Sequence, residues 1–104
     1  MVTKTTPDLI ARITLYATEA GGRKGPIVSG EIYRCPCKFH PNDVSGWDCG
    51  VLTNGERFSP GETKELGIIF LTPEIAPAFR LMPKFYLWEG RIIGEATVLT
   101  SKSS

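Results

Sequence analysis

The chain has 104 residues, and 41% of them are hydrophobic, which suits one domain with a modest core and leaves no room for two. Its 12 Lys and Arg nearly cancel its 11 Asp and Glu. The resulting net charge of +1 argues against a broad nucleic-acid-binding face, but it does not exclude a few local phosphate contacts.

The sequence carries no sign of a membrane or secretory protein. No apolar run approaches the roughly 20 residues of a membrane helix. The polar residues 1–8 predict that there is no signal peptide. Three cysteines are an odd number, which favours reduced thiols over a disulfide framework. We therefore expect a cytoplasmic protein with free cysteines and with neither a membrane nor DNA as partner.

Short segments of alternating apolar and polar residues follow one another along the chain. The first covers residues 9–18 and places Leu9, Ala11, Ile13 and Leu15 on one face, as in a half-buried strand. Five further strands are predicted at residues 31–39, 47–53, 63–71, 84–89 and 91–100. A glycine-rich loop at residues 19–26 and a tight Asn54-Gly55 turn punctuate them. Pro36 within the second strand suggests an edge or a bulge.

Only one part of the chain is a candidate for helix. Pro73, Pro77 and Pro83 restrict it to a turn or two, because proline lacks an N–H group and disfavours helix in the preceding residue. Six short strands without a long helix predict an all-β fold, a small barrel or sandwich. We expect a single domain over residues 1–104, with tails at about 1–7 and 101–104.

Six short segments form a specific pattern along the chain: Glu-Ala-Gly-Gly-Arg at 19–23 with Pro26, Ser-Gly at 29–30 with Tyr-Arg at 33–34, Asp-Val-Ser-Gly at 43–46, Pro-Gly-Glu at 60–62, Thr-Pro-Glu-Ile-Ala at 72–76, and Phe-Tyr-Leu-Trp-Glu-Gly-Arg-Ile-Ile-Gly at 85–94. In this order and at nearly this spacing, they resemble the third domain of translation elongation factor Tu. The similarity runs from about residue 12 to residue 100, which is nearly the whole chain.

The resemblance implies a six-stranded antiparallel barrel that helps to hold aminoacyl-tRNA by its T stem. In the family, the turns that match Arg23, Ser45, Glu89 and Arg91 meet beside that stem, so these four are the candidate RNA-binding residues. Pro36 stands where the family has a glutamine donor. The 104 residues contain no Gly-x-x-x-x-Gly-Lys-Ser/Thr phosphate loop, so we expect no GTP hydrolysis by that route.

The cysteines and the single histidine form the other candidate site. Cys35, Cys37, His40 and Cys49 are the residue types that bind tetrahedral zinc. Their spacing departs from the usual Cys-x-x-Cys knuckle, and a strand would point His40 away from the face that Cys35 and Cys37 share. The preferred interpretation is that Cys37 and Cys49 are buried as small hydrophobic residues, that His40 lies at the surface, and that the protein holds no metal or other cofactor.

Basic and aromatic residues offer a further, weaker pattern. Arg23, Lys24, Arg34 and Lys38 form a candidate basic patch near Tyr33, although an ordinary solvated face fits the balanced charge better. Because a small barrel needs large side chains inside, at least one of the two tryptophans, Trp47 and Trp88, is expected in the core.

Taken together, the sequence favours a non-catalytic binding module that engages tRNA or another component of the translation machinery. The first alternative is a protein-protein interaction module with no RNA role. The second alternative is a zinc protein centred on the cysteines and His40.

Overall fold

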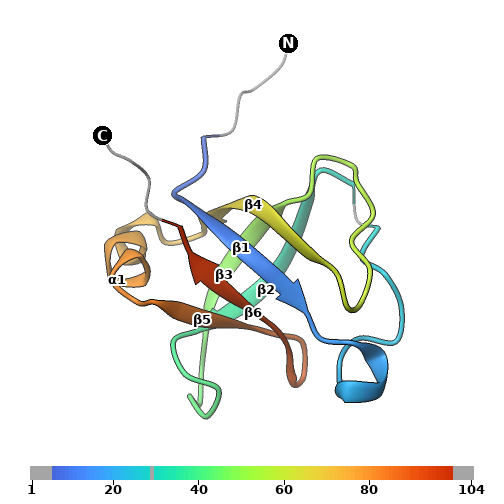
Figure 1. Ribbon diagram of the computed structural model, residues 1–104. Helices are drawn as coiled ribbons and strands as arrows, with labels where there is room; N and C mark the ends of the chain where they lie inside the picture. Colours follow the sequence, from blue (N-terminus) through green and yellow to red (C-terminus); the bar gives the residue numbers. More distant parts are fainter. Residues whose placement is uncertain (1–5, 29, 100–104) are drawn as a thin grey trace.

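The computed structural model describes residues 6–28 and 30–99, and in this part of the chain the six predicted strands all form. They close into an antiparallel barrel with the order β1-β4-β3-β2-β5-β6 (Figure 1). The strands are β1 (Leu9–Leu15), β2 (Ile32–Lys38), β3 (Trp47–Leu52), β4 (Thr63–Phe70), β5 (Lys84–Trp88) and β6 (Ile92–Val98). The all-β barrel expected from the sequence is therefore confirmed. The predicted tails lie mostly outside the described residues.

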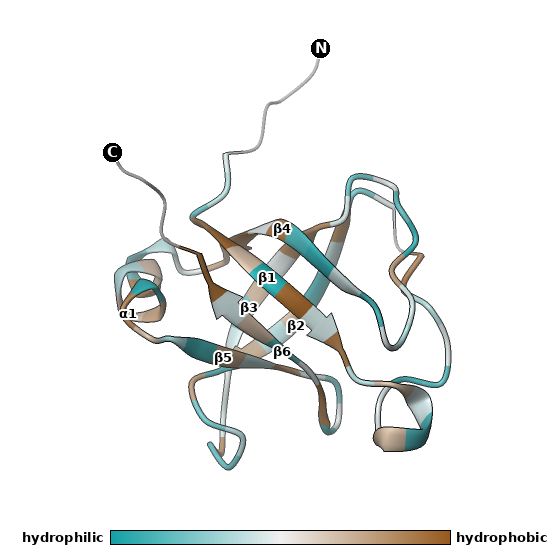
Figure 2. Ribbon diagram, in the orientation of Figure 1, coloured by the Kyte–Doolittle hydropathy of each residue, from teal (hydrophilic) through white to brown (hydrophobic). Residues whose placement is uncertain are grey.

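The period-two pattern sets which side chains enter the barrel. Along β1, Leu9, Ala11, Ile13 and Leu15 are all buried, while the residues between them face outward. Figure 2 shows a hydrophilic segment of β1 between hydrophobic ones. Each buried aliphatic side chain contributes about 1.5–3 kcal/mol relative to exposure. The inward faces of the six strands thus supply most of the core.

The only α-helix in the described residues is a single short turn at one end of the barrel. A 3-10 turn, η2 (Pro73–Ile75), leads into α1 (Ala76–Arg80), as the prolines of this segment predict. Its Phe79 is fully buried and its ring lies 4.2 Å from Phe39, 4.7 Å from Phe70 and 5.0 Å from Phe85. This aromatic cluster fills the barrel next to α1. No helix in the described residues is long and apolar enough to cross a membrane.

Pro36 does not mark an edge strand, because β2 lies between β3 and β5 in the closed barrel. Its register with β3 is regular, opposite Asp48, so the expected bulge is also absent there. Pairing with β5 covers only Cys37 and Lys38, and Pro36 lies just outside it. The edge interpretation is therefore wrong, because the barrel is closed. Proline is tolerated here because the β2–β5 pairing does not extend to Pro36, so no N–H donor is needed on that side.

Both tryptophans lie outside the core, which corrects the expectation for at least one of them. Trp47 is 39% exposed and Trp88 is half-buried. Four phenylalanines and the aliphatic side chains of the strands fill the interior instead, so the core does not need an indole ring.

Candidate functional site

The candidate site lies where the loop after β1 meets the turn between β5 and β6. A 3-10 turn, η1 (Thr18–Ala20), follows β1, and Gly21 ends it in the left-handed conformation, with φ of 96°. Gly22 then passes so close to the main chain just after β1 that a Cβ atom there would lie 2.0 Å from the Tyr16 carbonyl oxygen. Only glycine allows this approach, and the approach sets the position of Arg23.

Arg23 and Glu89 form the centre of the site. The Arg23 Nε donates hydrogen bonds to both Glu89 carboxylate oxygens, at 3.1 and 3.3 Å. Its Nη1 also donates to the Gly25 carbonyl at 2.9 Å. Across the turn, the Arg91 Nη2 donates to the Gly22 carbonyl at 3.0 Å. Three of the four candidate RNA-binding residues, Arg23, Glu89 and Arg91, are thereby brought together from segments 66 or more residues apart in sequence.

A shallow cavity of 480 Å³ opens between these two segments, and we call it the rim site. It is lined by Arg23, Lys24, Gly25, Glu89, Gly90, Arg91 and Ile93. Three cations against one carboxylate give it a formal charge of +2, in a chain whose net charge is only +1. The rim site therefore concentrates positive charge that the overall balance conceals, and its chemistry suits an anionic ligand.

Tyr33 supports Glu89 from inside the barrel. Its hydroxyl donates to the second Glu89 carboxylate oxygen, and the Arg23 guanidinium lies 5.7 Å from the centre of its ring. Burial of Tyr33, followed by its hydrogen bond to Glu89, raises the pKa of the phenol well above its ordinary value. The phenol therefore stays protonated and keeps donating at neutral pH. Glu89 is thus held from two sides, which makes it a positioning group for Arg23.

Ser45, the fourth candidate RNA-binding residue, does not join this cluster through any hydrogen bond or ion pair among the described residues. It lies exposed in the loop at residues 39–46. The link to the rim site is indirect: Lys38 donates to the Asp43 carbonyl of this loop at 2.8 Å and packs its amine over the Trp88 ring at 4.7 Å. Trp88 is the residue before Glu89.

The four residues of the candidate basic patch likewise do not all lie together at the rim site. Arg23 and Lys24 belong to the rim site, and the Arg23 guanidinium lies near the Tyr33 ring. Lys38 is buried and turned toward Trp88, while Arg34 lies exposed on β2. Sequence reasoning did not find the role of Tyr33 as a donor to Glu89, because these residues are 56 positions apart and nothing local relates them.

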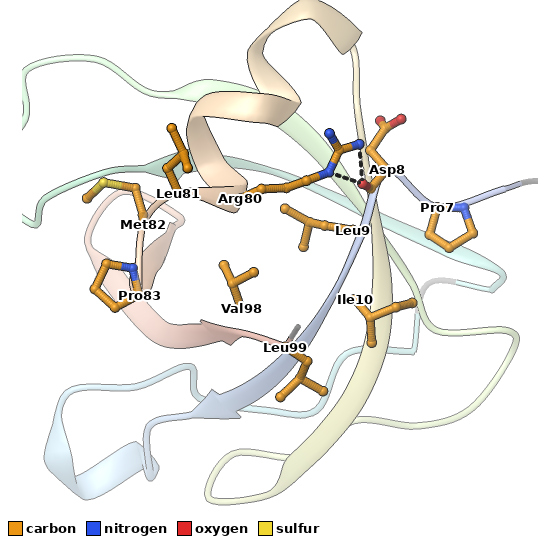
Figure 3. A pocket seen from close by; sticks show the side chains of 10 residues that line it. All are labelled: Pro7, Asp8, Leu9, Ile10, Arg80, Leu81, Met82, Pro83, Val98 and Leu99. Atoms are coloured by element: carbon orange, nitrogen blue, oxygen red, sulfur yellow. Dashed lines mark hydrogen bonds between the residues drawn. The ribbon is translucent and has the colours of Figure 1, made fainter. Parts of the chain in front are cut away.

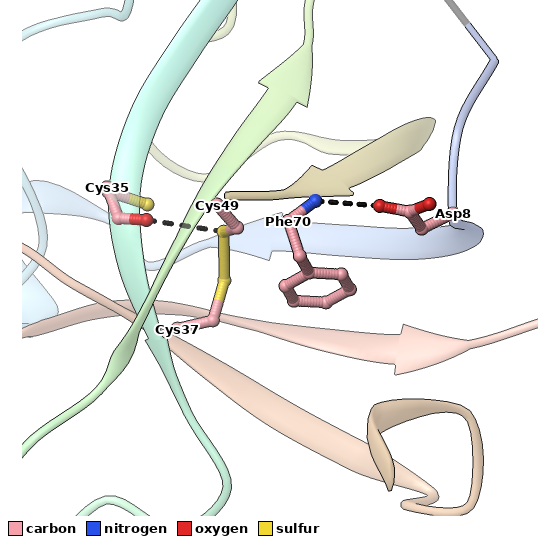
Figure 4. Close-up of a disulfide and its surroundings, with 5 residues drawn as sticks. All are labelled: Asp8, Cys35, Cys37, Cys49 and Phe70. Carbon is pink, nitrogen blue, oxygen red and sulfur yellow. Dashed lines mark hydrogen bonds between the residues drawn. A yellow bond between two sulfur atoms is a disulfide. The ribbon is translucent and has the colours of Figure 1, made fainter. Parts of the chain in front are cut away.

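The cysteines correct one expectation. Cys37 and Cys49 form a disulfide between β2 and β3, whereas reduced thiols were predicted (Figure 4). The register places Cys49 opposite Cys35 and diagonal to Cys37, and the Cα atoms of Cys37 and Cys49 are 6.3 Å apart, within disulfide range. Cys35 remains a buried free thiol. An odd count thus accommodates one bridge and one thiol.

The zinc alternative loses its ligand set through this bridge. A disulfide removes the Cys37 and Cys49 thiolates, and His40 is exposed, with its backbone N–H bonded to the Asp43 carboxylate at 3.1 Å. Within the described residues, no group of three or more His, Cys, Asp and Glu side chains is arranged to hold a metal ion.

Comparison with models of known protein families and with curated protein sequences found no match to this chain.

Proposed function

We propose that this protein is a non-catalytic, RNA-binding barrel that contacts the phosphate backbone of tRNA, or of a similarly structured RNA, through the rim site. The observation that carries the proposal is the meeting of Arg23, Lys24 and Arg91 around one carboxylate, with a local charge of +2. Arginine and lysine at such a rim bind phosphate oxygens through charge-assisted hydrogen bonds.

The resemblance to the third domain of elongation factor Tu supports the same assignment, because three of its four matched positions meet at this rim. The roles within the site differ from those expected. Glu89 already accepts from Arg23 and Tyr33, so the proposal gives contact with RNA to the exposed cations Lys24 and Arg91, and gives Glu89 the task of orienting Arg23. Ser45 would reach RNA only through a second, separate contact.

The test is tRNA binding measured as a function of salt. With about two or three phosphates neutralised, the affinity should be no tighter than micromolar, and log K should fall with log salt at a slope of about −2 to −3. The double variant Lys24→Ala, Arg91→Ala should lose most of the binding. Arg91→Ala removes its hydrogen bond to the Gly22 carbonyl, but neither change removes the Arg23 to Glu89 contacts, so the fold should be kept.

The matched control is Arg12→Ala with Arg80→Ala, which removes the same charge from positions outside the rim site. Equal loss in both double variants would mean that net charge alone drives binding. Absence of tRNA binding at low salt, while a protein partner is still captured, would replace the RNA function by the protein-interaction alternative.

A further inference from the structure

A second cavity, of 760 Å³, lies near the opposite end of β1 from the rim site. It is lined by Pro7, Asp8, Leu9, Ile10, Arg80, Leu81, Met82, Pro83, Val98 and Leu99. Figure 3 shows these side chains surrounding one opening, with the Arg80 guanidinium at its border. They come from the chain around the start of β1, from the end of α1 and the segment between α1 and β5, and from the chain around the end of β6. We call it the Arg80 groove. Its volume falls in the range of small-molecule sites, about 300–1,000 Å³.

The side chains that line the Arg80 groove are almost all apolar. Two of these large aliphatic side chains are exposed, Leu81 at 85% and Ile10 at 37%. Met82, Val98 and Leu99 add half-buried apolar surface between them. An apolar body inside the groove would remove this surface from water at about 25 cal/mol per Å².

Arg80 provides the one cationic group of the groove. Its Nε and Nη2 donate to the Asp8 main-chain carbonyl, at 3.0 and 2.8 Å, and that acceptor carries no charge. The Asp8 carboxylate is instead engaged by the Phe70 N–H, at 2.8 Å. Asp8 is the other charged residue that lines the groove. Within the described residues Arg80 makes no ion pair, so no carboxylate neutralises its charge by direct contact.

The main chain around the groove has few free N–H donors with which a peptide could form hydrogen bonds. The N–H groups of Asp8, Leu81, Met82, Val98 and Leu99 already donate to other carbonyls. Pro7 and Pro83 have no N–H group, and β1 and β6, which border the groove, are each paired with a strand on both sides. A peptide that docks as an added strand needs such donors. A ligand with one anionic head and an apolar body does not.

From this combination we infer that the Arg80 groove binds an amphipathic monocarboxylate, a molecule with one carboxylate at the Arg80 guanidinium and an unbranched apolar chain along Ile10, Leu81 and Val98. The inference is independent of the RNA function, because it uses different residues at the other end of β1.

The test uses decanoate as the probe, with binding measured by titration calorimetry and by NMR shifts of the groove amides. Decanoate should bind at one site, whereas decanol, which lacks the carboxylate, should bind at least about tenfold more weakly, a difference of about 1.4 kcal/mol. Acetate, which lacks the chain, should not saturate the site. Equal binding of decanol and decanoate, or no saturable binding of decanoate, would overturn the inference.

Two variants separately test the proposed contacts with the carboxylate, at Arg80, and with the apolar chain, at Leu81. Arg80→Gln keeps a donor for the Asp8 carbonyl but removes the charge, and should weaken decanoate about tenfold while leaving decanol unchanged. Leu81→Glu places a like charge beside the ligand and should weaken decanoate by a similar factor.

The control is Leu71→Glu, a change of the same kind at a 68% exposed leucine that does not line the groove. It should leave decanoate binding unchanged, and an equal loss there would indicate a non-specific charge effect and contradict the inference.

Binding of a carboxylate-ended apolar peptide in place of decanoate would also overturn the inference, in favour of a protein-docking groove. Loss of tRNA binding in the rim-site variant with decanoate binding kept would separate the two proposals.

Discussion

Gly22 is the residue on which the geometry of the rim site depends most directly. Its N–H donates to the Ala17 carbonyl at 3.0 Å, and its carbonyl accepts from Arg91. A Cβ atom here would meet main-chain atoms of Tyr16 and Ala17 at 2.0 to 2.9 Å, and main chain cannot move aside as a flexible side chain can. We predict that Gly22→Ala lowers the free energy of unfolding by about 1–3 kcal/mol and weakens tRNA binding.

Gly25 supplies the matched control for that prediction. It lies in the same loop, but a Cβ atom there would have no neighbour within 4 Å. Gly25→Ala should therefore change stability by no more than about 0.5 kcal/mol in urea unfolding. Equal effects of the two substitutions would mean that the close approach of Gly22 to the main chain of Tyr16 and Ala17 is not what holds the loop.

The buried Cys35 thiol predicts how the free energy of unfolding changes at high pH. Burial, and then the negative charge of Glu89, raise the pKa of this thiol from 9.0 to about 12. Because the folded pKa is above the unfolded one, the neutral thiol stabilises the fold fully below pH 9.0, and this contribution is lost as the pH rises toward about 12. In that window the slope from one thiol is about 1.4 kcal/mol per pH unit.

The measurement is urea unfolding at a series of pH values for the parent chain and for Cys35→Ala. In the variant, the decline of the free energy of unfolding should begin near the ordinary phenol pKa of 10.0 instead. Burial raises the pKa of Tyr16 to about 12 and also raises the pKa of Tyr33, so both phenols lose stabilisation above pH 10.0. Tyr16→Phe should keep the early onset. An unchanged onset in Cys35→Ala would contradict the assignment of that window to the thiol.

At the level of elements, the Cys37–Cys49 disulfide fastens β2 to β3 across a sequence separation of 12. By the chain-entropy estimate, closing a loop of this length in the unfolded chain stabilises the fold by about 2–3 kcal/mol. We therefore predict that reductant lowers the free energy of unfolding by that amount, measured in urea with and without a thiol reagent. Peptide mapping without reduction should recover the two residues linked.

Cys35→Ala and Cys37→Ala are the controls for the bridge. The first should respond to reductant as the parent chain does, and the second should be destabilised at the outset and insensitive to it. A linkage between Cys35 and Cys49, which face each other directly in the register, would contradict the assigned pairing.

The strands, turns and helix could be predicted from the sequence, but the way the strands pair could not. Strand alternation at residues 9–15 is a local property, so the strands, the turns and the short α1 could all be predicted. Which of Cys35 and Cys37 bridges Cys49 depends on the register between β2 and β3, which no local pattern contains. The same holds for Tyr33 beneath Glu89, and for the separation of Ser45 from the rim site.

The number of paired positions between neighbouring strands differs around the barrel. Strand β1 pairs at six positions with β4 and at five with β6, so both of its sides are held. Between β2 and β5 only two positions pair, Cys37 with Leu87 and Lys38 with Tyr86. Local opening needs the least free energy where the fewest interactions are lost. The β2–β5 seam is therefore where we expect the closed sheet to part first.

Native-state hydrogen exchange tests this expectation. Amides at the β2–β5 seam should exchange through an opening of lower free energy than the amides in the centre of β1, which should require global unfolding. Because Trp88 ends β5 and Glu89 follows it, an RNA bound at the rim site should slow exchange at the seam more than in β1. Seam amides protected as strongly as those of β1 would contradict this expectation, and would show that the packing of Lys38 over Trp88 closes the barrel as firmly here as the longer ladders do elsewhere.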